Sequence, residues 1–335
     1  MAHVATRRFT YWGQLGILML LMGVGLLVGQ GIDLLILVSK FPALLSDPEK
    51  TMNQILVPEN ADILRLTQLI AVLLMFVAPA IIYGRICHRK PLVHLGLAKN
   101  VFIPQVVIAV FLILAALPLV GAFRELTQHL PLGDYIRKKI AASKEEYSKT
   151  IMAIAVMRSF GEYLLTLFIV AILPGFAEEL FFRGAVQNLF TRWFKNPAAA
   201  ILLSAFIFSL FHFEYSDFIG RFFLGIVLGW VFYLTGNLWL NICMHAAFNG
   251  LSVTGLYLSL RSGGKLDTKD VEDHFNIYFT AGAVAILLLL AYYFYKLNKS
   301  RNAATPGEEI MLPGYTNPRD PFTDDLNSIG NKNQA

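Results

Sequence analysis

The chain has 335 residues, of which 56% are hydrophobic and only 15% are charged, and its formal net charge at pH 7 is +5. A water-soluble domain of this length carries more charge, so the composition excludes an ordinary soluble enzyme and indicates an integral membrane protein. The basic residues are scattered over loops between apolar runs and do not gather on one soluble face, so we expect no nucleic-acid partner.

Apolar runs recur along the chain, and each is long enough, at about 20 residues, to cross a ~30 Å hydrocarbon core as a helix. The first begins near Tyr11 and has no convincing cleavage site after it, so we expect it to be retained as a span. Hydropathy places eight candidate spans at residues 11–38, 64–86, 102–122, 159–192, 197–214, 217–235, 237–257 and 275–297. The sequence therefore predicts an all-α fold, a polytopic bundle of about eight transmembrane helices.

The polar stretches between and after these runs divide the chain into parts. Residues 1–158 form an N-terminal transmembrane region that ends in the basic segment 124–158, expected to lie partly as an amphipathic helix at the membrane interface. A second set of spans covers 159–257, and the last loop and transmembrane helix cover 258–300. After Arg301 the chain is polar and rich in Pro, Gly, Asp and Asn, so we expect 301–335 to be a disordered cytoplasmic tail.

The orientation is predicted from four basic clusters at the ends of the spans. These clusters are Arg7 and Arg8, then Arg85, Arg89, Lys90 and Lys99, then Arg192 and Lys195, and finally Lys296, Lys299 and Arg301. With eight spans all four clusters fall on one side of the membrane, and the positive-inside rule makes that side cytoplasmic, with both termini there. The basic segment 124–158 falls on the opposite side and argues against this orientation.

Three ionisable residues, Glu178, Glu179 and Arg183, lie inside an otherwise apolar stretch. A charged side chain near the bilayer centre costs at least ~2.5–3.5 kcal/mol, so each such residue is a functional hypothesis whose partner should be named. Residues four apart share a helical face, so Glu179 and Arg183 can form a structural ion pair, whereas Glu178 lies about 100° round the helix. Glu178 therefore needs a different explanation.

Three further polar residues, His212, His245 and Asn249, interrupt the later apolar spans. His245 and Asn249 are four apart and so point from one helical face towards a common place. The turn near Lys195 lies 17 residues from both Glu178 and His212, so two antiparallel helices would bring these two to a similar depth. His245 is only nine residues past its own turn at Gly236, so its depth matches less well.

Each of these residues also has a structural explanation, because a lone histidine in a membrane helix is often only a helix–helix hydrogen-bonding residue. For Glu179 and Arg183 we favour the structural pair. An unpaired Glu, two His and an Asn on three successive hydrophobic hairpins are better explained together as a functional site.

The ordered set resembles a known family. Glu-Glu-x-x-x-Arg at 178–183, Phe-x-x-x-His at 208–212 and His-x-x-x-Asn at 245–249 look like the motifs of the CAAX prenyl protease type II and bacteriocin-processing (CPBP, or Abi) family of intramembrane proteases. The resemblance covers about 160–255, so 159–257 is expected to be a CPBP-like catalytic core.

The resemblance implies a role for each matching residue. Glu178, with His212, would activate a water to attack a peptide carbonyl, and His245 with Asn249 would stabilise the resulting oxyanion. The supporting ion pair Glu179 and Arg183 would hold the helix and orient the base. The implied activity is an intramembrane endopeptidase acting on a membrane-associated substrate, prenylated or of leader type, and the implied partners are that peptide and the lipid bilayer.

Members of the family are reported both as glutamate proteases and as metal-dependent enzymes. Glu178, His212 and His245 would make a His₂Glu set like that of a catalytic zinc site, with a fourth position left for water. Asn249 is a poor zinc ligand but a good oxyanion donor. We therefore favour a mechanism with no cofactor and keep zinc, held by Glu178, His212 and His245, as the alternative.

A non-enzymatic membrane protein is the alternative function, either a proton- or ion-coupled transporter or an immunity-type scaffold. A transporter is expected to show repeat symmetry or paired broken helices, and the sequence signals neither. A silent scaffold is expected to have lost one of the polar motif residues, and none is lost.

Overall fold

The structure is a computed structural model that describes residues 9–88, 90–131, 133–263 and 277–304. Most of the residues in these ranges are helical and none forms a strand, which confirms the all-α prediction. In chain order the elements, with η marking a 3₁₀ or π segment, are α1 (Tyr11–Lys40), η1 (Pro42–Leu45), α2 (Pro48–Ile55), η2 (Pro58–Asn60), α3 (Ala61–Val72), η3 (Leu73–Val77), α4 (Ala78–Cys87), α5 (Pro91–His94), α6 (Ile103–Ala115), α7 (Leu117–His129), α8 (Asp134–Ile154), α9 (Phe160–Leu167), η4 (Phe168–Ile172), α10 (Leu173–Glu179), η5 (Leu180–Gln187), α11 (Asn188–Phe194), α12 (Pro197–Leu210), α13 (Phe218–Thr235), α14 (Leu238–Arg261) and α15 (Ile277–Ala304).

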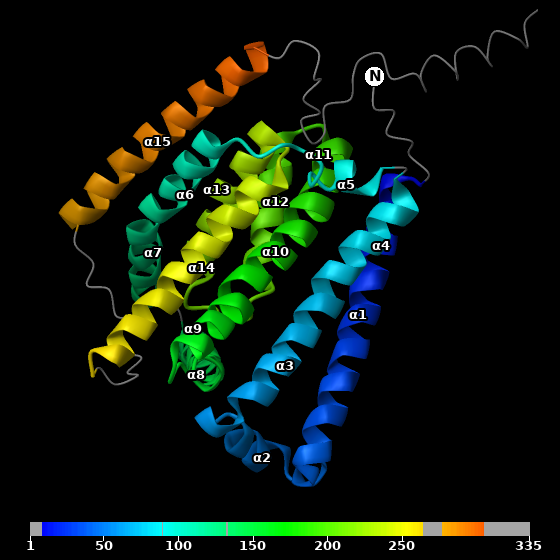
Figure 1. Cartoon of the computed structure of the whole chain (residues 1–335), viewed down its shortest axis with the longest axis vertical. Coiled ribbons are helices and arrows are strands. Elements are labelled where there is room, and N and C mark those ends of the chain that lie inside the picture. The colour runs from blue at the N-terminus through cyan, green and yellow to red at the C-terminus, as the bar shows by residue number, and fades with distance from the viewer. Residues whose placement is uncertain (1–8, 89, 132, 264–276, 305–335) are drawn as a thin grey trace, which may run out of the picture.

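Within the described ranges, six helices are long and apolar enough to cross a membrane. They are Tyr11–Lys40, Pro58–Cys87, Ile103–Thr127, Phe160–Phe194, Phe218–Thr235 and Tyr278–Ser300. The chain is therefore a multi-pass membrane protein, and the expected number of eight spans is approximate. The difference comes from α12, which has only 14 residues, and from α14, which is not among the six. Both still run alongside the other helices of the bundle (Figure 1).

Several boundaries differ from the predicted ones. The span expected at 197–214 ends as a helix at Leu210, so His212 lies in the loop that follows α12. The basic segment 124–158 forms the end of α7 and then α8, a helix of 21 residues that lies at the end of the bundle opposite α11 (Figure 1). Helix α15 continues to Ala304, past the expected start of the tail, and 305–335 lie outside the described residues.

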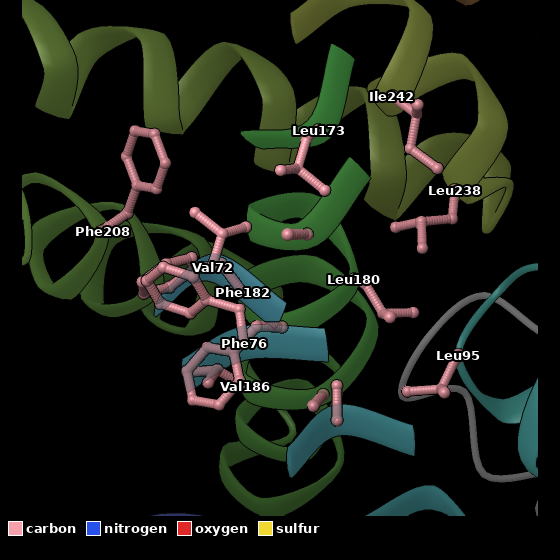
Figure 2. Packing of buried hydrophobic residues seen from close by; sticks show 14 of the residues in the cluster. Val72, Phe76, Leu95, Leu173, Leu180, Phe182, Val186, Phe208, Leu238 and Ile242 are labelled. Atoms are coloured by element: carbon pink, nitrogen blue, oxygen red, sulfur yellow. The ribbon is translucent and has the colours of Figure 1, made fainter. Parts of the chain in front are cut away.

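An aromatic cluster in the bundle fixes the helix that contains Glu178 and Glu179. Phe182 is fully buried and packs edge-on against Phe208 of α12, with ring centroids 5.3 Å apart, and against Phe76 of η3 at 5.7 Å. Figure 2 shows these rings between the surrounding helices, together with Leu238 and Ile242 of α14. Because lipid tails are as apolar as these side chains, the cluster stabilises the bundle through close packing.

The hairpin between α11 and α12 is formed by a turn at residues 195–197, and two of these three residues suit their positions. Lys195 ends α11 in the left-handed region, with φ of 52°. The side chain of Asn196 accepts a hydrogen bond from the backbone N–H of Ala199 at 3.2 Å, and Pro197 occupies the first helical position, where no N–H is needed. This turn reverses the chain and sets α12 antiparallel to the helix before it.

Candidate active site

Residues 160–194 form one continuous helical path, α9 to α11, that is interrupted by the π segments η4 and η5. The path passes the first half of α14 closely, because a Cβ on Gly175 would lie only 3.0 Å from the backbone nitrogen of Ala246. A residue without a side chain is therefore required at this crossing. The close approach brings His245 of α14 next to Glu178 and Glu179.

Glu179 is the most connected group of the site and is completely buried. Its Oε1 accepts from Arg183 Nη1 at 2.8 Å and from His245 Nδ1 at 2.8 Å, and its Oε2 accepts from Asn241 Nδ2 at 3.2 Å. The expected pair with Arg183 is present, and the carboxylate also holds the histidine of another helix. A buried carboxylate needs such partners, because an unpaired one would be expensive in this environment.

Arg183 is also enclosed on its other sides. Its Nη2 donates to the backbone carbonyl of Gly225 at 3.2 Å, and its guanidinium lies over the ring of Phe208, 4.6 Å from the ring centroid. A stacked, bonded guanidinium of this kind holds α10, α12 and α13 in register around Glu179.

Both histidine rings are oriented through Nδ1. His245 Nδ1 bonds Glu179, and His212 Nδ1 bonds the backbone carbonyl of Phe208 at 2.9 Å. A carbonyl can only accept, so His212 carries its proton on Nδ1 when neutral. The two Nε2 atoms then face Glu178, at 3.7 Å for His212 and 3.8 Å for His245, both measured to Oε2.

Glu178 differs from its neighbour because its carboxylate has room left. Its Oε2 is buried and makes no hydrogen bond within the described part of the chain. The gaps to the two Nε2 atoms are longer than a direct hydrogen bond, so the lone pairs of this oxygen are left for a water or a substrate atom bound beside the imidazoles. Asn249 is half-buried one turn after His245 on α14, on the same helical face.

The depth of His245, which the sequence left unmatched, follows from the way α14 begins. The backbone N–H of Leu238 donates to Gly96 at 2.9 Å, and a Cβ on Gly184 would lie 3.1 Å from the carbonyl oxygen of Leu95. The turn before α14 is thus docked at the height of Gly184 and not at the height of Lys195. His245 then needs fewer residues to reach the level of Glu178.

Asn241 is a site residue that the sequence reasoning missed. Its Nδ2 donates both to Glu179 and to the carbonyl of Leu228 at 2.8 Å, so it fastens the carboxylate to the middle of α13. The signal was available, because Asn241, His245 and Asn249 are spaced by four and share one face of α14.

Glu178, His212 and His245 are residue types that bind zinc, through imidazole nitrogens and a carboxylate oxygen. The Nδ1 atom of each imidazole already makes a hydrogen bond that orients the ring. Glu178 Oε2 lies 3.7 and 3.8 Å from the two Nε2 atoms, and the described residues contain no group of three His, Cys, Asp or Glu side chains placed to hold a metal ion. We therefore derive no reaction step through a metal.

Comparison with known families agrees with the motif resemblance. Residues 160–251 match the family model described as type II CAAX prenyl endopeptidase Rce1-like. The matched segment includes all six motif residues and ends just after Asn249. The chain matches no curated protein and no solved structure. The family match supports a CAAX-type intramembrane protease that acts on a membrane-associated peptide.

Proposed function

We propose that this protein is an intramembrane endopeptidase in which Glu178 activates a water against a peptide bond of a membrane-associated substrate. The observation that carries the proposal is the position of the Glu178 Oε2 atom. It is buried, it makes no hydrogen bond to any residue that the structure describes, and it faces the Nε2 atoms of His212 and His245 at 3.7 and 3.8 Å.

Glu178 and His212 act on the nucleophile. A water bound beside the Glu178 carboxylate and the His212 Nε2 gives one proton to the carboxylate. The oxygen of that water attacks the substrate carbonyl carbon. The His212 Nδ1 is committed to the carbonyl of Phe208, so Nε2 is left as an acceptor that orients the water. When the C–N bond breaks, the protonated Glu178 returns its proton to the leaving amine.

His245 and Asn249 act on the carbonyl oxygen. The buried carboxylate of Glu179 accepts from His245 Nδ1 and holds the ring with Nε2 toward the site, and a proton on Nε2 makes that atom a donor to the developing oxyanion. The amide of Asn249 supplies a second donor from the same helical face. Donors held in place before the reaction are most effective where water is scarce.

The substrate class follows from the surroundings of the site. The site lies among helices that are apolar enough to cross a membrane, so a peptide reaches it most readily if its own anchor is in the bilayer. A C-terminal segment carrying a prenyl chain and a leader peptide with an apolar run both satisfy this requirement.

The proposal is tested by incubating the purified protein, reconstituted in lipid vesicles, with a panel of membrane-anchored peptides. The panel contains matched prenylated, leader-type and unanchored sequences, and mass spectrometry identifies the cleaved bond. We expect cleavage of an anchored peptide and none of its unanchored counterpart. Failure to cleave any peptide, combined with proton- or ion-coupled uptake into the vesicles, would support the transporter alternative.

The choice between water activation by Glu178 alone and zinc is tested on the same preparation. Protein purified without added metal is assayed for bound metals by mass spectrometry and for activity with and without a chelator. We expect activity without stoichiometric zinc. Activity that is lost to the chelator and restored by zinc would instead assign Glu178, His212 and His245 as ligands.

A further inference from the structure

His212 lies on a short loop, residues 211–217, and not on a helix. The next residue, Phe213, has φ of 53°, which is a left-handed conformation that side chains with a Cβ seldom adopt. Such a conformation is strained and persists only where the surrounding structure holds it in place. The loop therefore needs an anchor, and none of the six motif residues lies on it except His212 itself.

The anchor is a cluster of ion pairs that begins two residues after His212. Glu214 is buried, with 3% of its surface exposed, and its Oε2 pairs with Arg221 Nη1 at 2.8 Å. The same Nη1 donates to the backbone carbonyl of Glu214 at 2.8 Å, and Glu214 Oε1 accepts from the N–H of Ser216 at 2.9 Å. One arginine on the first turns of α13 thus fixes both the side chain and the backbone of the loop.

A second carboxylate extends the cluster to α7. Asp217 accepts from both Nε and Nη2 of Arg124, the latter at 2.9 Å, and it also lies 3.8 Å from Arg221 Nη2. A two-pronged arginine–carboxylate pair has a fixed geometry, which a single lysine could not impose. The loop is therefore held between α7 and α13.

Helix α8 covers the outside of the cluster. The ring of Tyr147 lies over the Arg221 guanidinium at 5.4 Å, and the backbone N–H of Tyr215 donates to Ser143 Oγ at 3.4 Å. The Arg221 charge thus lies between the acidic groups of the loop 211–217 and the aromatic ring of Tyr147 on α8.

We propose that the cluster of Glu214, Arg221, Asp217 and Arg124 is a positioning device for His212, which holds the ring so that Nε2 faces Glu178. This inference rests on the proposed function, because the cluster would hold the His212 imidazole that takes part in the proposed peptide hydrolysis. The members of the cluster do not touch the reacting atoms and act only through the loop. A misplacement of about 1 Å in such a group can lower the rate roughly 100-fold, so the cluster need not be close to the substrate to matter.

The test compares Glu214→Gln and Asp217→Asn with the wild type, using a peptide that the wild type cleaves. Glu214→Gln keeps the size of the side chain and an oxygen for Ser216 but loses the charge that holds Arg221. We expect kcat to fall about 10- to 100-fold while KM changes less than about twofold, with a smaller fall for Asp217→Asn, since that residue acts one step further from His212. Glu214→Asp, which restores the charge, should recover part of the rate.

A matched control separates positioning from general loss of stability. Arg65→Gln removes another buried arginine, whose bonds to the carbonyl of Ile154 and to Thr166 involve no residue of the loop 211–217. All variants are assayed below their unfolding temperatures. If Arg65→Gln and Glu214→Gln lower kcat equally, or if Glu214→Gln keeps the wild-type kcat, the positioning role is wrong.

The outcome also distinguishes this inference from the proposed function. If the wild type cleaves and Glu178→Gln does not, but Glu214→Gln and Asp217→Asn turn over normally, only the positioning inference fails. If neither the wild type nor any variant cleaves a peptide, the proposed function fails and the inference fails with it. Should Glu214→Gln not fold, Asp217→Asn decides alone by the split between kcat and KM.

Discussion

Neutralising Glu179 should destabilise the bundle far more than neutralising a surface glutamate in the same local arrangement. The carboxylate is fully buried and balances Arg183, which is 1% exposed. Removing one member of a buried ion pair leaves the other uncompensated and costs ~3–5 kcal/mol. We expect Glu179→Gln to lower the free energy of unfolding by this order, even though the amide oxygen can still accept from His245.

The double variant shows whether the loss comes from the stranded charge. With Arg183→Leu added, neither member of the pair is left as an uncompensated charge, so the double variant should be more stable than the sum of the two single losses predicts. The expected coupling free energy is on the order of 2 kcal/mol, within the range found for residues in direct contact. The recovery should be incomplete, because Arg183 also donates to Gly225 and covers Phe208.

The assay is reversible unfolding in mixed micelles, followed by tryptophan fluorescence. The matched control is Glu145→Gln, because Glu145 and Lys149 form a pair with the same spacing of four and a distance of 2.7 Å on the exposed surface of α8. That pair is screened by solvent, so its loss should not be measurable. If the single losses at Glu179 and Arg183 were additive, or no larger than that of Glu145→Gln, the account of the buried pair would be wrong.

Three further predictions use other parts of the chain. In a background without Cys87 and Cys243, single cysteines that replace Lys90, Asn196 and Ser300 should be labelled from one side of the membrane, and cysteines that replace Lys50 and Ser262 from the other. Labelling at position 196 from the second side would contradict the hairpin between α11 and α12. Gly225→Ala should lower the free energy of unfolding by ~1–3 kcal/mol, because the new Cβ would lie 2.8 Å from the Cβ of Ala205. Gly255→Ala, where the space is open, should not destabilise the protein. Equal effects of the two substitutions would refute the close crossing of α12 and α13. Burial, with the nearby Arg192 charge, lowers the pKa of His88 to about 3, so below pH ~6.5 the unfolded chain binds a proton that the folded chain does not. The free energy of unfolding should therefore fall as the pH drops from 6.5, by about 2 kcal/mol at pH 5 for this residue. The variant His88→Gln should show a flatter pH dependence of unfolding.

The sequence predicts the general architecture because apolar runs and helical spacing are local properties. The pairing of Glu179 with Arg183 follows from a separation of four residues, and the facing of Glu178 and His212 follows from equal distances to one turn. The helix end at Leu210 could not be read in this way, since hydropathy continues through Phe213 while the helical hydrogen bonding stops.

Contacts between segments distant in sequence were also beyond local reasoning. The bond from Glu179 to His245 depends on the close crossing at Gly175, and the height of α14 depends on the docking of Leu238 on Gly96. Glu214 and Asp217 fall at the ends of the expected spans 197–214 and 217–235, and their partners Arg221 and Arg124 are found only once the helices are packed. Spacing identifies groups on one helix, and packing decides which groups of different helices meet.

The central claim is that Glu178 is the base of a peptide hydrolysis. The most direct measurement is the rate of cleavage of one membrane-anchored peptide by purified wild type and by Glu178→Gln, with Glu59→Gln as an exposed control and with unfolding measured on the same samples. Glutamine keeps the size and hydrogen bonding of the side chain but cannot take a proton at neutral pH. We predict cleavage by the wild type and by Glu59→Gln, and none by a Glu178→Gln protein that remains folded. Near-normal turnover by Glu178→Gln would contradict the account.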